Sequence, residues 1–184
     1  MLALYCPRQY EGTTYVLPFS SPDVRALVHE AKFYGNRMAT ELLGEVLLHH
    51  FSTTMKNDAV VIPMPLSRAR MRARGYNQVV EIARIALKSC KHMTVMENVL
   101  VRIRDTKPQT ELVRGERTNN VANAFACLPA RQGIRDVSDA ERILKNAHVI
   151  LLDDVVTTGS TMKAAKSALS KCRPASITCV ALAH

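Results

Sequence analysis

Long apolar segments are missing from this chain of 184 residues. Its longest apolar runs, such as residues 149–152, fall far short of the ~20 residues that a membrane-spanning helix needs. The N-terminal segment MLALYCPRQYEG has neither the basic start nor the long apolar stretch of a secretory signal peptide. We therefore expect a soluble, cytoplasmic protein with no membrane span.

Cysteine pairs at metal-binding spacing are also missing. The five cysteines include no C-x-x-C pair, and none of the six histidines joins a metal-ligand pattern. An odd, scattered set of cysteines argues against a disulfide framework, so we interpret these thiols as buried and chemically inert. The sequence thus predicts no metal ion held directly by the protein. The cysteines are Cys6, Cys90, Cys127, Cys172 and Cys179.

Acidic residues are outnumbered by basic ones. The chain has 25 Lys and Arg against 16 Asp and Glu, which gives a formal net charge of +9. Such an excess indicates an anionic partner, whether nucleic acid, an acidic membrane surface or a polyphosphate metabolite. Residues 67–74 read SRARMRAR and carry four of these positive charges. On its own, this segment is typical of the solvated face of an amphipathic helix.

The chain does contain enough apolar material for a folded core, since apolar residues make up 47% of it. Apolar spacing predicts one helix from Pro22, one after Gly35 and one after Gly75, and Met38 is expected on the inward face of the second. A further helix is predicted over residues 159–171. Short apolar runs predict strands at residues 14–19, 59–62, 99–103, 148–152 and 175–182.

Strands that alternate with helices predict an α/β fold with a mainly parallel central sheet and helices on both faces. No repeat or flexible linker divides the chain, so residues 1–184 are expected to form a single domain. Within it, residues 1–55 form an N-terminal portion and residues 56–184 the core. Because ligands bind at the carboxyl edge of parallel sheets, the strand ends at Pro63 and Asp153 are the places to examine.

The strongest motif is VILLDDVVTTGST, residues 149–161. A buried strand delivers two carboxylates, Asp153 and Asp154, and a hydroxyl-rich turn with Gly159 then leads into a helix. Backbone N–H groups, hydroxyls and a helix N-terminus together suit a phosphate monoester, and the two acids suit vicinal ribose hydroxyls or a cation. The alternative is an ordinary helix cap supplied by Thr157 or Ser160, which leaves the two acids unexplained.

This motif resembles the signature of type I phosphoribosyltransferases. The resemblance implies that Asp153 and Asp154 hold the ribose hydroxyls of phosphoribosyl pyrophosphate (PRPP) and act as the catalytic acids. It also implies that the turn holds the 5′-phosphate. The fold implied is the type I phosphoribosyltransferase fold, with a small hood and lid region. The implied phosphate-loop residues are Val156, Thr157, Thr158, Gly159, Ser160 and Thr161.

Three further segments resemble the ComF family, which belongs to this class and includes competence protein F and predicted amidophosphoribosyltransferases. They are LVHEAKFYG (27–35), VIPMPLSRARMRARGYNQ (61–78) and RDTKPQTELVRGERTNNVANAF (104–125). ComF proteins usually begin with a cysteine-rich zinc-binding segment, whereas here only Cys6 precedes the common core. We therefore expect the usual zinc segment to be absent from this sequence.

The resemblance also implies where pyrophosphate binds. The loop after the strand at residues 59–62 occupies the place of the pyrophosphate loop, although its prolines remove two N–H donors. The polar segment 104–120 is interpreted as a lid that keeps water from the reacting sugar. The expected pyrophosphate ligands are Pro63, Met64, Pro65, Arg74, Lys107 and Arg117, with Gln109 and Arg114 as further lid candidates.

The function expected from this resemblance is transfer of a phosphoribosyl group from PRPP to an unknown nucleophile, with release of pyrophosphate. Mg²⁺ would be bound through substrate oxygens and water rather than by protein ligands. The alternative is a non-catalytic accessory protein in DNA uptake that binds PRPP or nucleic acid. Single-stranded DNA and a second copy of the chain, as a homodimer, are the partners that stay open.

Overall fold

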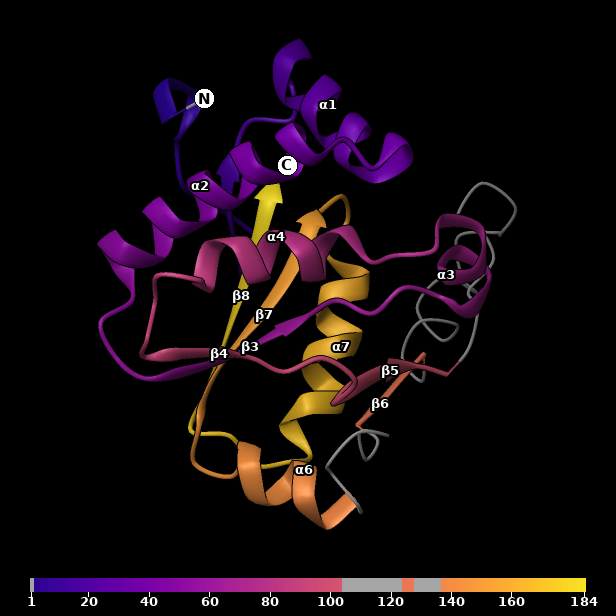
Figure 1. Cartoon of the computed structure of the whole chain (residues 1–184). Helices are drawn as coiled ribbons and strands as arrows, with labels where there is room; N and C mark the ends of the chain where they lie inside the picture. The colour runs from indigo at the N-terminus through magenta and orange to yellow at the C-terminus, as the bar shows by residue number, and fades with distance from the viewer. Residues whose placement is uncertain (1, 104–123, 128–136) are drawn as a thin grey trace.

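The computed structural model of the chain describes residues 2–103, 124–127 and 137–184 (Figure 1). These residues contain a six-stranded sheet in the order β1-β2-β8-β7-β3-β4, in which only the β1–β2 pair is antiparallel. The α/β fold with a mainly parallel sheet is thereby confirmed. The strands of this sheet are β1 (Arg8–Tyr10), β2 (Thr13–Leu17), β3 (Ala59–Pro63), β4 (Met93–Val95), β7 (His148–Val155) and β8 (Ser176–Ala183).

A second, two-stranded sheet pairs β5 (Leu100–Arg102) antiparallel with β6 (Phe125–Cys127). The predicted lid segment, residues 104–120 with Gln109 and Arg114, lies between these strands in the sequence and wholly outside the described residues. Among the helices of the described part of the chain, none has the length and apolar character needed to cross a bilayer. These helices are α1 (Pro22–His29), the π-helix η2 (Glu30–Tyr34), α2 (Arg37–Thr54), α3 (Arg68–Arg74), α4 (Gln78–Leu87), α6 (Val137–Leu144) and α7 (Ser160–Ser170).

Strand β7 is buried on both faces of the sheet, which explains its continuous apolar run. Its residues Ile150 and Leu152 pack with α2 and α4 in one apolar cluster. Val149 and Leu151 pack with α7 in the other cluster. Figure 1 shows the corresponding layers, with α2 and α4 on one side of the sheet and α7 on the other. This burial holds the carboxyl end of β7 firmly at the edge where the two acids emerge.

Two expectations about burial are wrong. Met38 is 71% exposed, because it lies on the outward face of the first turn of α2, whereas Ala39 and Thr40 are the buried residues of that turn. The cysteines are all free thiols, but only Cys90, Cys172 and Cys179 are buried, whereas Cys127 is half-buried and Cys6 is exposed. The inward stripe of α2 instead runs along residues further down the helix. It includes Leu43, Val46, Leu47 and Phe51.

Candidate ligand-binding site at the sheet edge

The carboxyl end of β7 places Asp153 and Asp154 in different surroundings. Asp153 is partly exposed, and its Oδ1 accepts a hydrogen bond of 2.8 Å from the backbone N–H of Asp154. Asp154 is only 6% exposed, and its Oδ1 accepts a bond of 2.8 Å from the N–H of Val155. The alternation of side chains along a strand explains why the two adjacent acids point to opposite sides.

Asp154 joins three elements of the fold through its second oxygen. Its Oδ2 lies 3.0 Å from the Lys32 ammonium of η2 and accepts a hydrogen bond of 2.5 Å from Nε2 of Gln78 in α4. The Oε1 of Gln78 in turn accepts a hydrogen bond from the guanidinium of Arg74. These partners compensate the buried charge and link Asp154 to η2 and α4, whereas Asp153 keeps part of its surface exposed.

Burial and the negative charge of Asp154 raise the pKa of the Asp153 carboxyl above its ordinary value. The backbone N–H of Asp154 and the positive charge of Lys32 act in the opposite direction. A carboxyl with a raised pKa holds its proton at higher pH than usual. A ligand that donates hydrogen bonds from two hydroxyls to Asp153 would favour the ionised form and displace that proton.

The hydroxyl-rich turn begins at Val156, whose backbone N–H and carbonyl both form hydrogen bonds. Its N–H donates to the carbonyl of Ala183 at 3.0 Å, and its carbonyl lies 2.9 Å from Nδ1 of His184. The His184 ring stacks on Tyr10, with ring centroids 3.9 Å apart. The turn therefore starts from a rigid base, while Thr157 and Thr158 after it are exposed.

The first turn of α7 offers its backbone N–H groups toward this loop. The residue at the N-cap position is Gly159, with φ +70°, which has no side chain to cap the helix, and Thr158 Oγ1 accepts only a long hydrogen bond of 3.5 Å from the N–H of Ser160. Thr158 Oγ1 is instead 2.9 Å from Oγ of Ser160, with Ser160 and Thr161 partly exposed. The alternative of an ordinary cap from Thr157 or Ser160 is thus not what the structure has. A helix N-terminus that is only weakly capped and lies beside hydroxyls suits an anion.

Close packing against Glu11 also favours glycine at position 159. A Cβ at this position would lie 3.0 Å from Cβ of Glu11, in the turn between β1 and β2. The Glu11 carboxylate forms an ion pair of 2.5 Å with Lys163, one turn into α7. The N-terminal hairpin therefore packs directly against the loop, and a larger residue at Gly159 would disturb the fold as well as any ligand.

The loop after β3 offers few backbone donors, although it was predicted to hold pyrophosphate. Pro63 and Pro65 have no N–H, and the N–H of Met64 donates to the carbonyl of Leu152 at 2.7 Å. The carbonyl of Met64 accepts a 3.0 Å hydrogen bond from Asn77. Any anion near this loop would have to be held mainly by side chains.

Such side chains line a cavity of about 470 Å³ between η2 and α3. Lys32, Arg70 and Arg74 surround it together with Phe33 and Ala73. The Arg74 guanidinium lies 5.3 Å from the centre of the Phe33 ring. Burial lowers the pKa of Arg74, and the nearby Asp154 carboxylate offsets part of this effect.

The structure brings some of the predicted site residues together, and it adds residues that were not predicted. Asp153, the loop from Val156 to Thr161 and Arg74 lie at one edge of the sheet, whereas Lys107 and Arg117 lie outside the described residues. Lys32, Gln78 and Arg70 had been given no role at this edge. Lys32 and Gln78 belong to the segments LVHEAKFYG and RGYNQ, so the motifs themselves were the available signal.

Comparison with known proteins assigns the chain to a class. Residues 47–184 match the phosphoribosyl transferase domain family. Among solved structures, the chain is similar to hypoxanthine-guanine phosphoribosyltransferase of L. donovani, with 14% identity, a TM-score of 0.39, and coverage of 78% of this chain and 64% of that one.

Curated relatives narrow the assignment. The chain is 30% identical to DNA utilization protein YhgH of Salmonella typhimurium over 147 residues, covering 77% of this chain and 59% of that protein. It is 29% identical to competence protein F of Haemophilus influenzae, covering 64% of this chain and 46% of that protein. The chain belongs to the ComF family of proteins with a phosphoribosyltransferase domain, and it spans about half to three fifths of the length of these relatives.

Proposed function

We propose that this chain binds PRPP and transfers its phosphoribosyl group to a nucleophile, with release of pyrophosphate. The observation that carries the proposal is the meeting of three features at one edge of the sheet. These are the partly exposed Asp153, the hydroxyl-rich turn at Gly159, and the cavity that Lys32, Arg70 and Arg74 surround. They match the ribose, the 5′-phosphate and the pyrophosphate of one molecule.

Each group then has a defined task. Asp153 would accept hydrogen bonds from the ribose hydroxyls, and its charge would stabilise the positive charge that develops as the bond from C1 to pyrophosphate breaks. The N–H groups at the start of α7 would anchor the 5′-phosphate and so fix the position of C1. The nucleophile forms the new bond to C1, and the electron pair of the broken bond leaves with pyrophosphate, so no protein nucleophile is required.

The residues fit a magnesium ion that is carried by the substrate. Within the described ranges, no group of three His, Cys, Asp or Glu side chains is placed to hold a metal ion. Mg²⁺ keeps several waters and binds readily to substrate phosphates, so it would be held by PRPP and water while Asp153 binds the ribose. When bound, the ion would reduce the negative charge on the departing pyrophosphate.

Calorimetric titration with PRPP and Mg²⁺ tests the proposal. We expect saturable binding by the wild-type protein and weaker binding of ribose 5-phosphate, which lacks the pyrophosphate. Asp153→Asn should weaken PRPP binding at least about tenfold, because a charge-assisted hydrogen bond contributes about 1.5–3 kcal/mol. Asp58→Asn is the matched control, since Asp58 is exposed and lies just before β3 at the opposite edge of the sheet. Equal PRPP affinity in both variants would refute the assignment of Asp153.

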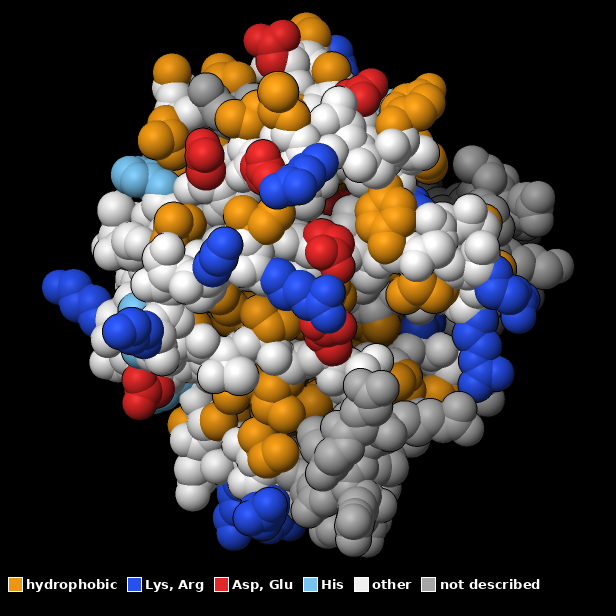
Figure 2. All heavy atoms as spheres, viewed as in Figure 1, with side chains coloured by type: hydrophobic (Ala, Val, Ile, Leu, Met, Phe, Trp, Pro, Cys, Tyr) orange, Lys and Arg blue, Asp and Glu red, His pale blue; other side chains and the backbone are white. Residues whose placement is uncertain are grey.

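Binding of single-stranded DNA is the second candidate function, and one observation favours it. Basic side chains gather where α3 lies, at the edge of the view in Figure 2. On the rest of that face, however, basic and acidic side chains alternate. The arginines of α3 also divide between two cavities, with Arg70 facing one and Arg68 and Arg72 the other. A continuous basic groove would suit a nucleic-acid strand better, so the metabolite is the preferred ligand.

The acceptor can be identified by following pyrophosphate release from PRPP with ammonia, amines and nucleobases in turn. Release that requires an acceptor would establish a transferase. Tight PRPP binding without release in any mixture would instead support the non-catalytic accessory role. The homodimer and the cytoplasmic location stay predictions, which sedimentation and cell fractionation can test.

A further inference from the structure

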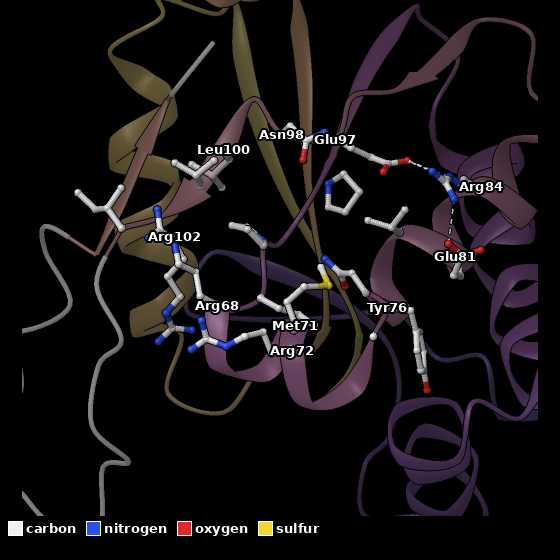
Figure 3. A pocket seen from close by; sticks show the side chains of 18 residues that line it. Arg68, Met71, Arg72, Tyr76, Glu81, Arg84, Glu97, Asn98, Leu100 and Arg102 are labelled. Atoms are coloured by element: carbon white, nitrogen blue, oxygen red, sulfur yellow. Dashed lines mark hydrogen bonds and ion pairs between the residues drawn. The ribbon is translucent and has the colours of Figure 1, made fainter. Parts of the chain in front are cut away.

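A second, larger cavity lies on the other side of α3. Its volume is about 650 Å³, within the range of ~300–1,000 Å³ that is usual for small-molecule sites. The loop after β3, helix α3, the start of α4 and strand β5 enclose it (Figure 3). None of the residues that line it also lines the cavity at Lys32, so the two are separate spaces.

Positive charge is concentrated at one end of this cavity. Figure 3 shows the side chains of Arg68, Arg72 and Arg102 converging there, two from α3 and one from β5. Arg68 and Arg72 are exposed, and neither has an ion-pair partner among the residues that the structure describes. Arg102 also lies over the Phe125 ring, 5.6 Å from its centre. Guanidinium groups from two elements form a fork that suits a phosphate monoester.

The opposite end of the cavity carries one arginine and two glutamates, which gives it a net charge of −1. Arg84 lies 2.9 Å from the carboxylate of Glu81 and 2.7 Å from that of Glu97. These three side chains are joined in Figure 3, away from the other arginines. The cavity is therefore polarised, with positive charge from Arg68 and Arg72 at one end and a small net negative charge at the other. Such an arrangement orients a ligand that is charged at one end only.

Apolar side chains also line the cavity, and the amide of Asn98 lies at its rim. Leu66 and Leu100 line the interior, and Met71 and Ile103 are 40% and 53% exposed beside it. Exposed apolar side chains at a cavity favour an apolar or aromatic ligand. The Asn98 side chain points toward the cavity in Figure 3, and no hydrogen-bond partner satisfies its amide within residues 2–103, 124–127 and 137–184. An amide can both donate to and accept from the edge of a nucleobase.

We infer that this cavity is a second binding site, which takes a nucleoside monophosphate. Its phosphate lies between Arg68, Arg72 and Arg102, its base lies against Leu66 and Leu100, and the base edge meets Asn98. The site is independent of the proposed PRPP site, because the wall formed by α3 turns Arg70 and Arg74 toward one ligand and Arg68 and Arg72 toward the other.

Calorimetric titrations with 5′-AMP and 5′-UMP test this inference, with adenosine, inorganic phosphate and ribose 5-phosphate as partial ligands. The nucleotides should bind more tightly than any partial ligand. The double variant Arg68→Gln, Arg72→Gln should weaken nucleotide binding at least about tenfold, because it removes two charged donors. Arg70→Gln is the matched control, since it changes the same residue type on the same helix and faces the other cavity.

The same variants are titrated with PRPP and Mg²⁺, so that the two sites are judged separately. We expect the double variant to keep its PRPP affinity and Arg70→Gln to keep its nucleotide affinity. Nucleotide binding that is lost in Arg70→Gln or Asp153→Asn but kept in the double variant would place the nucleotide in the PRPP site and overturn the inference. Absence of nucleotide binding by the wild-type protein, or equal binding of free phosphate, would overturn it as well, whether or not PRPP binds.

Discussion

The ion pair between Lys32 and Asp154 should be among the most valuable polar contacts in the fold. Lys32→Met keeps the apolar stem of the side chain and removes only its charge. Asp154, which is 6% exposed, would then keep Gln78 as its remaining side-chain partner. Breaking a buried pair costs about 3–5 kcal/mol, but the Lys32 side chain is 26% exposed, so we expect about 2 kcal/mol. For a chain of this size, that lowers the melting temperature by about 4–8 °C.

Thermal unfolding followed by circular dichroism measures this loss. Lys163→Met is the matched control, because it breaks a lysine ion pair whose side chains are 62% and 45% exposed, and exposed pairs contribute about 0–1 kcal/mol. In the double variant Lys32→Met, Asp154→Asn, the buried charge is gone and part of the lost stability should return. The ion pair has no such role if Lys32→Met is no more destabilising than Lys163→Met, or if Asp154→Asn adds its full cost to that of Lys32→Met.

Three other predictions follow from the same geometry. Because the pKa of Asp153 is raised, the folded chain binds this proton more tightly than the unfolded chain, and the melting temperature should therefore fall as pH rises through that pKa. Over the same pH range, PRPP affinity measured by calorimetry should rise, because the carboxylate becomes ionised. Asp153→Asn should flatten both pH profiles. Gly159→Ala should destabilise the free protein by about 1–2 kcal/mol, because φ is positive and Cβ of Glu11 is close; Glu11→Gly should restore part of this loss in denaturant unfolding. Burial lowers the pKa of His50 to about 4, so stability should decrease by up to about 3 kcal/mol as pH falls from about 6.5 toward that value, and His50→Gln should lose this dependence.

The parts of the fold that the sequence predicted well are those whose pattern is local. The strand β7 and the helix α7 follow from an apolar run, two acids and a glycine turn, all within residues 149–171. Helix α4 follows from its apolar stripe after Gly75. In each case the spacing of apolar residues along the chain indicates which side of the element is buried.

Other features could not be predicted because they depend on contacts between distant segments. The hydrogen bond from Gln78 to Asp154 joins residues 76 positions apart, and only the folded sheet shows that Lys32 completes the same cluster. Arg68, Arg70 and Arg72 belong to one basic segment of the sequence. In the structure, however, α3 directs Arg70 toward one cavity and Arg68 and Arg72 toward the other. The short strand β1, which spans three residues, is too brief for an alternating pattern to be recognised.

The contact of the N-terminal hairpin with the phosphate loop means that the working unit is larger than the segment that matches the domain family. Residues 47–184 carry the match, but Glu11 packs on the loop from outside that segment, and Lys32 reaches the acids from outside it too. Strand β2 also covers one edge of β8 along a parallel ladder. A fragment cut at residue 47 would therefore expose an apolar strand edge that invites association with other chains, and it would lack two of the charges that surround the loop and the acids.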